Sequence, residues 1–376
     1  MRGDMIMVNN SQLDISSLPD IPSEVANEYK DKLNLIINRV NNTLNSRDDI
    51  NKLIGYNSLS TMHDLNENNA KFMSNLFQIN DYQLFKTTLP WVYKAYYNQG
   101  FSYKYFRVEI KVWIEAVKEF IKPEFREEII AVYKWILDNH ENIIQLSKEV
   151  KVNNEEIPEK WQKTYSQFLQ YLLAGDHLEA DKLSKEIIET KEDARDFFEY
   201  VIKNALYEVG ELWENGKVSI AEEHMASSIS SRVLSNIYMN FLDNISEKGK
   251  IVITSIANEF HELGARIIAD SLELEGWDVK YLGADTPLID LIKLLVDHKP
   301  FALGLSVSMS FNLENLINAV NKIKATPELE DLKIFVGGKV FNENPGLWKK
   351  TGADGWARNS EKAVEIVEDW WQEENK

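Results

Sequence analysis

A glutamate and a histidine stand two residues apart, at Glu259 and His261, after a strongly apolar stretch of the chain. A carboxylate in this position can accept the proton of one imidazole nitrogen and leave the other nitrogen to bind a metal. Gly264 follows three residues later and lets a ligand come close to the backbone, because it has no side chain. A pattern of three fixed positions, Glu259, His261 and Gly264, also occurs by chance. The prediction that His261 is a metal ligand therefore needs support from the surrounding elements.

Those elements are typical of an open α/β sheet. Residues 251–256 are apolar and largely β-branched, which predicts a buried strand. Such sheets bind ligands at the carboxyl ends of their strands, where His261 would lie. Strands and helices then alternate, and we expect a doubly wound parallel, Rossmann-like sheet over residues 249–376. The expected strands are 251–257, 278–281, 301–305 and 333–336, and the expected helices are 265–276, 288–298, 312–325, 345–350 and 361–373.

Small residues follow the later strands at matching places. Ser306 and Ser308 come after one strand, and Gly337 and Gly338 come after the next. Together with Glu-x-His-x-x-Gly, this pattern resembles the signature of cobalamin-binding domains. In that family the loop histidine replaces the cofactor's benzimidazole as the lower cobalt ligand, and the displaced nucleotide tail lies in a slot along the sheet. The resemblance implies a cobalamin with His261 on cobalt and with Glu259, Phe260, Gly264, Ser306, Ser308, Gly337 and Gly338 around the cofactor.

A second group of polar and aromatic residues lies before the sheet. Helical patterns at 161–173, 176–190, 192–214 and 219–242 predict a four-helix bundle over residues 158–246. Ser219 with Glu222 forms a capping box at the start of the fourth helix. In Trp213, Glu223 and His224, an indole could shield an organometallic bond and a carboxylate could accept hydrogen bonds from a ribose or adenine. The alternative is a packed tryptophan beside an ordinary polar helix start.

The spacing Trp-x9-Glu-His resembles the CarH-like adenosylcobalamin photoreceptors. In that family the three residues surround an adenosyl group on cobalt, and green light breaks the cobalt–carbon bond. The resemblance implies the same role for Trp213, Glu223 and His224. Two features depart from it. No basic helix-turn-helix pattern precedes the bundle, and Glu214 stands where some members have a second histidine.

The first part of the chain is expected to be helical. We expect a mobile tail over residues 1–22 and a helical sensor or interaction domain over 23–152, with a polar joint at 152–158. A helix is expected from residue 24, a partly looped stretch over 41–69, and four or five helices over 70–150. The aromatic residues are expected to form a core, and His140 to be an exposed histidine.

Composition limits the classes of function. The 376 residues include 44% hydrophobic residues and no cysteine, so a thiolate site is excluded. No signal peptide and no apolar run of ~20 residues is evident, so we expect a soluble, cytoplasmic protein without membrane contact. The net charge is −18, and residues 1–150 carry 17 Lys and Arg against 20 Asp and Glu. This balance argues against nucleic-acid binding and favours a protein partner or a homo-oligomer.

Two functions fit these patterns. The first is a cobalamin-binding light sensor and signalling protein, a receptor rather than an enzyme, that holds adenosylcobalamin. The alternative is a corrinoid methyl carrier of a methyltransferase system, which would hold methylcobalamin with the same ligand, His261. Carriers commonly have aspartate where this chain has Glu259, and they need an upper cofactor face that is open to partner active sites.

Overall fold

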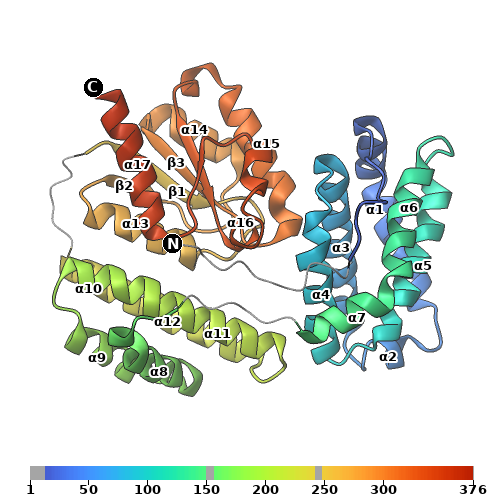
Figure 1. Cartoon of the computed structure of the whole chain (residues 1–376), viewed down its shortest axis with the longest axis horizontal. Helices are drawn as coiled ribbons and strands as arrows, with labels where there is room; N and C mark the ends of the chain where they lie inside the picture. The colour runs from blue at the N-terminus through green and yellow to red at the C-terminus, as the bar shows by residue number, and fades with distance from the viewer. Residues whose placement is uncertain (1–12, 150–155, 242–247, 376) are drawn as a thin grey trace. The chain divides into compact units, whose positions relative to one another are not determined.

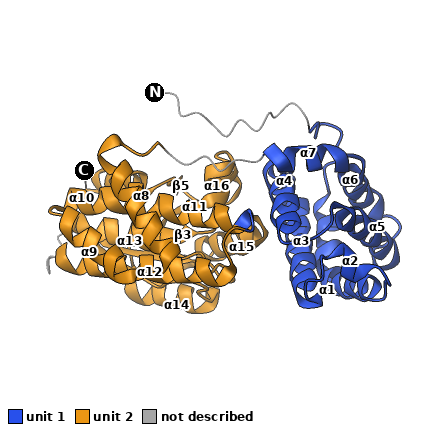
Figure 2. Ribbon diagram, turned by 90° about the horizontal axis from the view of Figure 1, so that it is seen from below, with its two compact units in different colours: residues 1–151, 214–216 blue, residues 152–213, 217–376 orange. Residues whose placement is uncertain are grey.

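The computed structural model describes residues 13–149, 156–241 and 248–375. The chain divides into two compact units, shown in Figure 2. The first comprises residues 1–151 with 214–216, and the second comprises residues 152–213 and 217–376. In the described part of the chain, no helix is long and apolar enough to cross a bilayer. We describe each unit by itself.

The first unit is helical, as the sequence predicts. Over residues 13–149 it contains α1 (Ser23–Asn45), α2 (Ile50–Leu53), α3 (Leu59–Ile79), α4 (Gln83–Asn98), α5 (Tyr103–Phe120), α6 (Arg126–Asp138) and α7 (His140–Glu149). Most of the stretch 41–69, expected to be partly loop, is therefore helical. Burial of the aromatic side chains confirms their place in the core, which includes Tyr29, Phe77, Phe85, Tyr105, Phe106 and Trp113.

The segment before α1 packs against the helices. The indole Nε1 of Trp135 donates to the carbonyl oxygen of Asp14 at 2.9 Å, and the hydroxyl of Tyr82 donates to that of Pro19 at 2.6 Å. Ile21 is buried. The prediction of a mobile tail over 1–22 is thus wrong for residues 13–22, because apolar anchors within a polar segment hold it. Residues 1–12 lie outside the described residues.

His140 differs from its prediction as well. Its side chain is buried, and its Nδ1 lies 3.1 Å from the hydroxyl oxygen of Tyr93. Burial lowers the pKa of this imidazole, an effect that Arg107 reinforces and Glu141 opposes. The histidine begins α7, and the packing of α7 against α4 encloses the ring. Sequence pattern at a helix end did not reveal this tertiary contact.

The second unit begins with the four-helix bundle. Its helices are α8 (Glu159–Ala174), α9 (His177–Ile187), a continuous third helix made of α10 (Lys191–Asp196), the π-helical segment η1 (Phe197–Ile202) and α11 (Lys203–Glu214), and α12 (Ile220–Phe241). The capping box is confirmed, since the backbone N–H of Ser219 donates to Glu222 Oε2 at 2.7 Å and the backbone N–H of Glu222 donates to Ser219 Oγ at 3.3 Å. Trp161, Phe168, Phe197 and Phe198 fill its core.

The rest of the unit is the predicted doubly wound sheet, so the fold class is confirmed. Five parallel strands lie in the order β2-β1-β3-β4-β5, and α13 and α17 cover one face while α14 and α15 cover the other (Figure 1). The strands are β1 (Lys250–Ser255), β2 (Asp278–Tyr281), β3 (Ala302–Ser306), β4 (Lys333–Gly337) and β5 (Gly355–Trp356). The helices are α13 (Leu263–Leu274), α14 (Leu288–His298), α15 (Leu313–Lys324), α16 (Lys339–Glu343) and α17 (Ser360–Glu374).

Three details of the sheet domain were not predicted. One is the five-residue helix α16 (Lys339–Glu343). The strand β5 is only two residues long, which is too short for a periodic pattern. Residues 345–350 form the 3-10 turn η4 (Leu347–Lys350) rather than an α-helix.

The bundle contacts the sheet domain through α12 and α13. Ile267 and Leu274 of α13 join the apolar core of the bundle. The guanidinium of Arg266 donates to the hydroxyl oxygens of Ser231 at 3.0 Å and Ser235 at 2.8 Å, both on α12. The helical bundle therefore packs on the helix that directly follows the predicted histidine loop.

Candidate functional site

The register of the sheet brings the predicted site residues to one edge. Ser255 at the end of β1 pairs with Ser306 at the end of β3, and Ser306 pairs with Gly337 at the end of β4. Because all these strands run parallel, the loops that leave them start side by side. The His261 loop, the serines and the glycine pair thus meet at the carboxyl edge of the sheet, where open α/β sheets bind ligands.

The loop between β1 and α13 has a fixed shape. Asn258 has φ +65, a left-handed conformation that asparagine tolerates better than most residues. Its backbone N–H donates to Asp285 Oδ1 at 2.7 Å, and the N–H of Asp285 donates to the carbonyl oxygen of Glu259 at 3.1 Å. Asp285 follows β2, so the neighbouring loop of the sheet holds this reversal of the chain in place.

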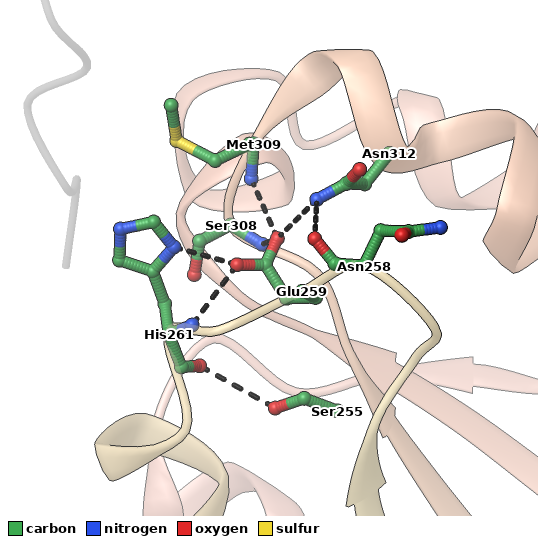
Figure 3. A network of polar contacts seen from close by, with 7 residues as sticks. All are labelled: Ser255, Asn258, Glu259, His261, Ser308, Met309 and Asn312. Carbon is green, nitrogen blue, oxygen red and sulfur yellow. Dashed lines mark hydrogen bonds and ion pairs between the residues drawn. The ribbon is translucent and has the colours of Figure 1, made fainter. Parts of the chain in front are cut away.

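Glu259 and His261 form the pair that the sequence predicts (Figure 3). Glu259 Oε1 lies 2.5 Å from His261 Nδ1 and accepts from the backbone N–H of His261 at 3.1 Å. The Glu259 side chain is 1% exposed, whereas that of His261 is 61% exposed. The buried carboxylate engages Nδ1, so Nε2 is the nitrogen that can bind a metal at the surface of the loop.

The second oxygen of Glu259 is also surrounded by donors. Glu259 Oε2 accepts from the backbone N–H groups of Ser308 at 2.9 Å and Met309 at 3.1 Å, and from Asn312 Nδ2 at 3.2 Å. Burial alone would raise the pKa of this carboxyl. The hydrogen bond and charge of His261 and the two backbone donors outweigh burial, and the net pKa is lowered. The carboxylate therefore stays ionised beside the imidazole.

The packing of the backbone gives a structural reason for glycine after β4, independent of any ligand. Gly338 has φ +112, and a Cβ there would overlap the carbonyl group of Val307. A Cβ at Gly337 would lie 3.1 Å from the carbonyl oxygen of Ala357. Close backbone packing against Val307 after β3 thus requires glycine at position 338, whereas a side chain at position 337 would meet a tight contact that a small shift could relieve. The role of the two glycines, and that of Ser306 and Ser308, in lining a nucleotide-tail slot stays a prediction.

The surface beside His261 is open. A Cβ at Gly264 would meet no atom within 4 Å, and Phe260 is 70% exposed. An exposed phenyl ring next to an exposed imidazole suits contact with a large flat ligand, because such contact would bury apolar area that is now in water. The residues present therefore fit the lower face of a corrin, with one imidazole nitrogen available for cobalt.

The second predicted group, Trp213, Glu223 and His224, is held by fewer hydrogen bonds than the Glu259 and His261 pair. His224 Nδ1 lies 2.6 Å from Glu223 Oε2, and Ser227 Oγ donates to Glu223 Oε1 at 2.9 Å. The His224 side chain is 74% exposed, and Trp213 is half-buried near the end of α11. Across the described ranges, no hydrogen bond or ion pair joins these residues to the His261 loop. Contact of the trio with an upper cobalt ligand stays a prediction.

Sequence reasoning missed Asn312 and Asp285. Asn312 is buried and reaches both Glu259 and the carbonyl oxygen of Asn258. The only available signal was an asparagine at the start of the expected helix 312–325, a place where asparagine more often caps a helix. Asp285 follows β2 in a turn-forming sequence, and nothing in that sequence indicates its contact with Asn258.

Comparison with known proteins supports the lower site. Residues 249–367 match the family model of a B12 binding domain, and residues 165–238 match a second B12 binding domain model. The chain is 24% identical over 188 residues to dimethylamine corrinoid protein 3 of Methanosarcina acetivorans, covering 48% of this chain and 87% of that protein. It is 25% identical over 221 residues to the trimethylamine corrinoid protein of Methanosarcina barkeri, covering 57% of this chain and 96% of that protein.

A solved structure is also similar in part. The monomethylamine corrinoid protein of Methanosarcina barkeri matches with a TM-score of 0.48 and 16% identity, covering 56% of this chain and 99% of that chain.

These comparisons correct the first functional prediction. The relatives are corrinoid proteins named for methylamines, so the prediction of a light sensor, a photoreceptor with a signalling role, is wrong. The photoreceptor resemblance rested on three positions, and the structure shows two of them, the half-buried Glu223 and the exposed His224, as a pair on the first turn of a capped helix. A polar first turn with acidic residues is common at helix starts, because acidic residues are favoured there.

The cofactor prediction is confirmed at the level of cobalamin. The two B12 binding domain models match consecutive regions of the chain, residues 165–238 and residues 249–367. The helical bundle occupies the first region and the parallel sheet occupies the second. Residues 165–238 and 249–367 of this chain are B12-binding domains, a helical cap followed by a doubly wound sheet domain, and the cofactor they hold is cobalamin.

Proposed function

We propose that this protein is a corrinoid methyl carrier of a methyltransferase system. The observation that carries the proposal is the similarity to the dimethylamine and trimethylamine corrinoid proteins, which extends over 87% and 96% of their lengths. Similarity over nearly a whole carrier favours the same kind of task, whereas a match to the sheet domain alone would favour only the cofactor. The chain would carry the methyl group, and partner methyltransferases would catalyse its transfer.

The lower site suits this task. Bound cobalamin supplies a cobalt centre that accepts and releases a methyl group. His261 would bind cobalt through Nε2, because Nδ1 is engaged by Glu259 at 2.5 Å. A single ligand from the His261 loop would leave the other face of a bound cofactor accessible to partner active sites. Glu259 performs the orienting contact here although carriers commonly have the shorter aspartate at this position.

The remaining parts of the chain suggest where partners bind. We propose that a methyltransferase approaches the face of the corrin opposite His261, near Trp213, Glu223 and His224. The helical domain over residues 23–152 is proposed to assist partner binding. Self-association into a homo-oligomer and the lack of nucleic-acid binding stay predictions, the second supported by the net charge of −18.

The proposal is tested by following a labelled methyl group. The full chain is reconstituted with cobalamin, reduced, and mixed with purified methylamine-specific methyltransferases and trimethylamine, dimethylamine or monomethylamine that carries deuterated methyl groups. Mass spectrometry of the extracted corrinoid should show a deuterated methyl group only when a cognate methyltransferase is present. Absence of labelled corrinoid with every methyltransferase and amine, from protein that binds cobalamin fully, would contradict the carrier function.

A further inference from the structure

Glu214 takes part in a contact that neither cobalamin binding nor the proposed methyl transfer uses. It is the last residue of α11, and the turn at Asn215 and Gly216 follows it before α12. An acidic residue at the carboxyl end of a helix is unfavourable, because the negative end of the helix dipole lies there. Glu214 is nevertheless only 5% exposed. A contact outside α11 therefore has to compensate for this position.

The first unit supplies that contact. Residues 214–216 belong to this unit, although they lie between α11 and α12 in the sequence. The indole Nε1 of Trp91 donates to Glu214 Oε1 at 2.7 Å, and Asn98 Nδ2 donates to the carbonyl oxygen of Glu214 at 2.8 Å. Both donors are on α4 and are seven residues apart, so they lie on one face of that helix. Lys94, one turn after Trp91, gives the same face a positive charge.

The turn has a fixed shape and comes close to the backbone of α4. The backbone N–H groups of Lys217 and Val218 donate to the carbonyl oxygen of Leu212 at 2.8 Å and 3.3 Å, and these bonds close the turn. Gly216 has φ +66, and a Cβ there would lie 3.1 Å from the carbonyl oxygen of Asn98. A side chain at position 216 would thus be strained and would crowd α4. A turn of fixed shape binds at a lower entropic cost than a mobile one.

We propose that α4 is a receptor for the turn at residues 214–216, and that capture of this turn keeps other macromolecules away from it. Trp213 directly precedes the turn, and the methyltransferase of the proposed function approaches near Trp213. A partner cannot contact the Glu214 side chain while Trp91 and Asn98 cover it. The contact is therefore autoinhibitory, because the helical domain has to release the turn first. The inference rests on the proposed function only in naming a methyltransferase as the excluded partner.

The contact is small enough to be reversible. The first unit includes three residues from beyond position 151, and these are the residues of the turn. A hydrogen bond to a carboxylate changes an equilibrium constant by about tenfold to a hundredfold, and the bond from Trp91 to Glu214 is of this kind. Removal of this bond should therefore raise the released population of the turn by a measurable factor.

Trypsin is the probe for access, because it is a macromolecule that cleaves after Lys217, an exposed residue next to the turn. The full chain is loaded with cobalamin and digested briefly, and mass spectrometry gives the initial rate of cleavage after Lys217. Trp91→Phe removes the indole donor and leaves the sequence of the turn unchanged, and Glu214→Ala removes the acceptor. Trp135→Phe is the matched control, because it removes an indole hydrogen bond to Asp14 elsewhere in the first unit.

Cleavage after Lys217 should be at least tenfold faster in Trp91→Phe and in Glu214→Ala, because proteolysis follows the population of the released turn. It should stay unchanged in Trp135→Phe. The double variant should be no faster than either single variant, since both substitutions remove the same bond. Thermal unfolding reports the folding of each variant, and Glu214→Ala keeps the test valid if Trp91→Phe folds poorly.

A second readout is the initial rate of deuterated methyl transfer from a cognate methyltransferase, which should rise in Trp91→Phe and not in Trp135→Phe. Equal cleavage rates in the unaltered chain and in both single variants, or an equal increase in Trp135→Phe, would overturn capture of the turn. Faster cleavage without faster methyl transfer would overturn the autoinhibitory role. Absence of methyl transfer from every protein would contradict the carrier function, and the cleavage rates would still decide whether α4 captures the turn.

Discussion

Two Glu–His pairs in the second unit show how burial changes the chemistry of the same residue types. In the pair Glu259 and His261 the carboxylate is fully buried and both of its oxygens accept hydrogen bonds. The donors to Oε2 include the buried side-chain amide of Asn312. In the pair Glu223 and His224 the imidazole is 74% exposed and the carboxylate has one further donor, a serine hydroxyl. Both pairs have short contacts between carboxylate and Nδ1.

The difference lies in what else fixes each carboxylate. A buried carboxylate must be paired and hydrogen-bonded, because an unpaired buried charge is strongly destabilising. The donors around Glu259 therefore hold it in one place, and it in turn holds the imidazole. An exposed pair competes with water and contributes about 0–1 kcal/mol. We infer that only the first pair is organised in advance to bind cobalt.

The largest expected effect comes from removing the buried pair's histidine. His261→Ala should weaken cobalamin binding by more than about a hundredfold, beyond what loss of an outer partner costs. The absorption spectrum should shift to a form with no histidine on cobalt. His224→Ala is the matched control and should change affinity by less than about tenfold if the exposed pair lacks this organisation. Equal losses in the two variants would remove the distinction between the pairs.

The next effect concerns the carboxylate itself. An amide at position 259 can accept from His261, but its NH2 group would then face the donors of Ser308, Met309 and Asn312. Glu259→Gln should therefore cost about 1–3 kcal/mol through unsatisfied buried donors, and weaken the histidine–cobalt contact as well. Denaturant unfolding and cobalamin titration measure the two effects. Glu223→Gln, where water can replace lost bonds, should leave both within error.

A third carboxyl, that of Glu109, shows the effect of burial on a pKa where hydrogen bonds are too few to offset it. Glu109 in the first unit is buried, and within the described residues it has two side-chain donors, Asn69 and Trp113, both on Oε1 at 3.0 Å. Burial outweighs these bonds and raises its pKa from 4.5 to about 7. Where Glu259 gains enough donors to stay ionised, Glu109 does not, so the two buried carboxyls should respond to pH in opposite directions.

The sign for Glu109 follows from proton binding. Between pH 4.5 and about 7 the unfolded chain releases this proton while the folded chain keeps it. The free energy of unfolding should thus fall as pH rises through that window, by roughly 3 kcal/mol, and level off above it. Glu109→Gln should reduce this slope in denaturant unfolding measured from pH 4.5 to 8, and the part due to Asp270, whose pKa burial also raises to about 7, should remain. A slope that is unchanged in the variant would show that Glu109 does not contribute to it.

The smallest effect is expected at the exposed pair. Glu223→Gln and His224→Ala should each change the free energy of unfolding by less than about 1 kcal/mol, in keeping with exposed ion pairs. Thermal or denaturant unfolding of the protein without cofactor checks this. A loss of several kcal/mol in either variant would show that the pair is structurally organised after all.

Much of the second unit could be predicted from the sequence because its signals are local. The apolar run before Glu259 predicts a buried strand, and the Ser219 capping box predicts the start of α12, as observed. The histidine and its carboxylate lie two residues apart, so spacing alone suggests their contact, and the structure shows it at 2.5 Å. Local pattern and tertiary fold agree at these places.

The remaining features depend on contacts between distant segments. Asn312 lies 53 residues from Glu259, and its amide bond cannot be deduced from either neighbourhood. His140 is buried by packing of α7 on α4, and the segment before α1 is held by Trp135 and Tyr82 far along the chain. The spacing of Trp213, Glu223 and His224 led to a wrong prediction, because this short pattern was taken to indicate a photoreceptor, a function that the relatives do not support.

The central claim is that His261 of this chain is the lower ligand of cobalt in bound cobalamin. Electron paramagnetic resonance of the cobalt(II) form tests it directly, because an axial nitrogen splits the cobalt lines according to its nuclear spin. Protein with nitrogen-14 should give triplets, and protein in which only histidine carries nitrogen-15 should give doublets that disappear in His261→Ala. Triplets that persist in the nitrogen-15 histidine protein would show the cofactor's own base still on cobalt and would contradict the claim.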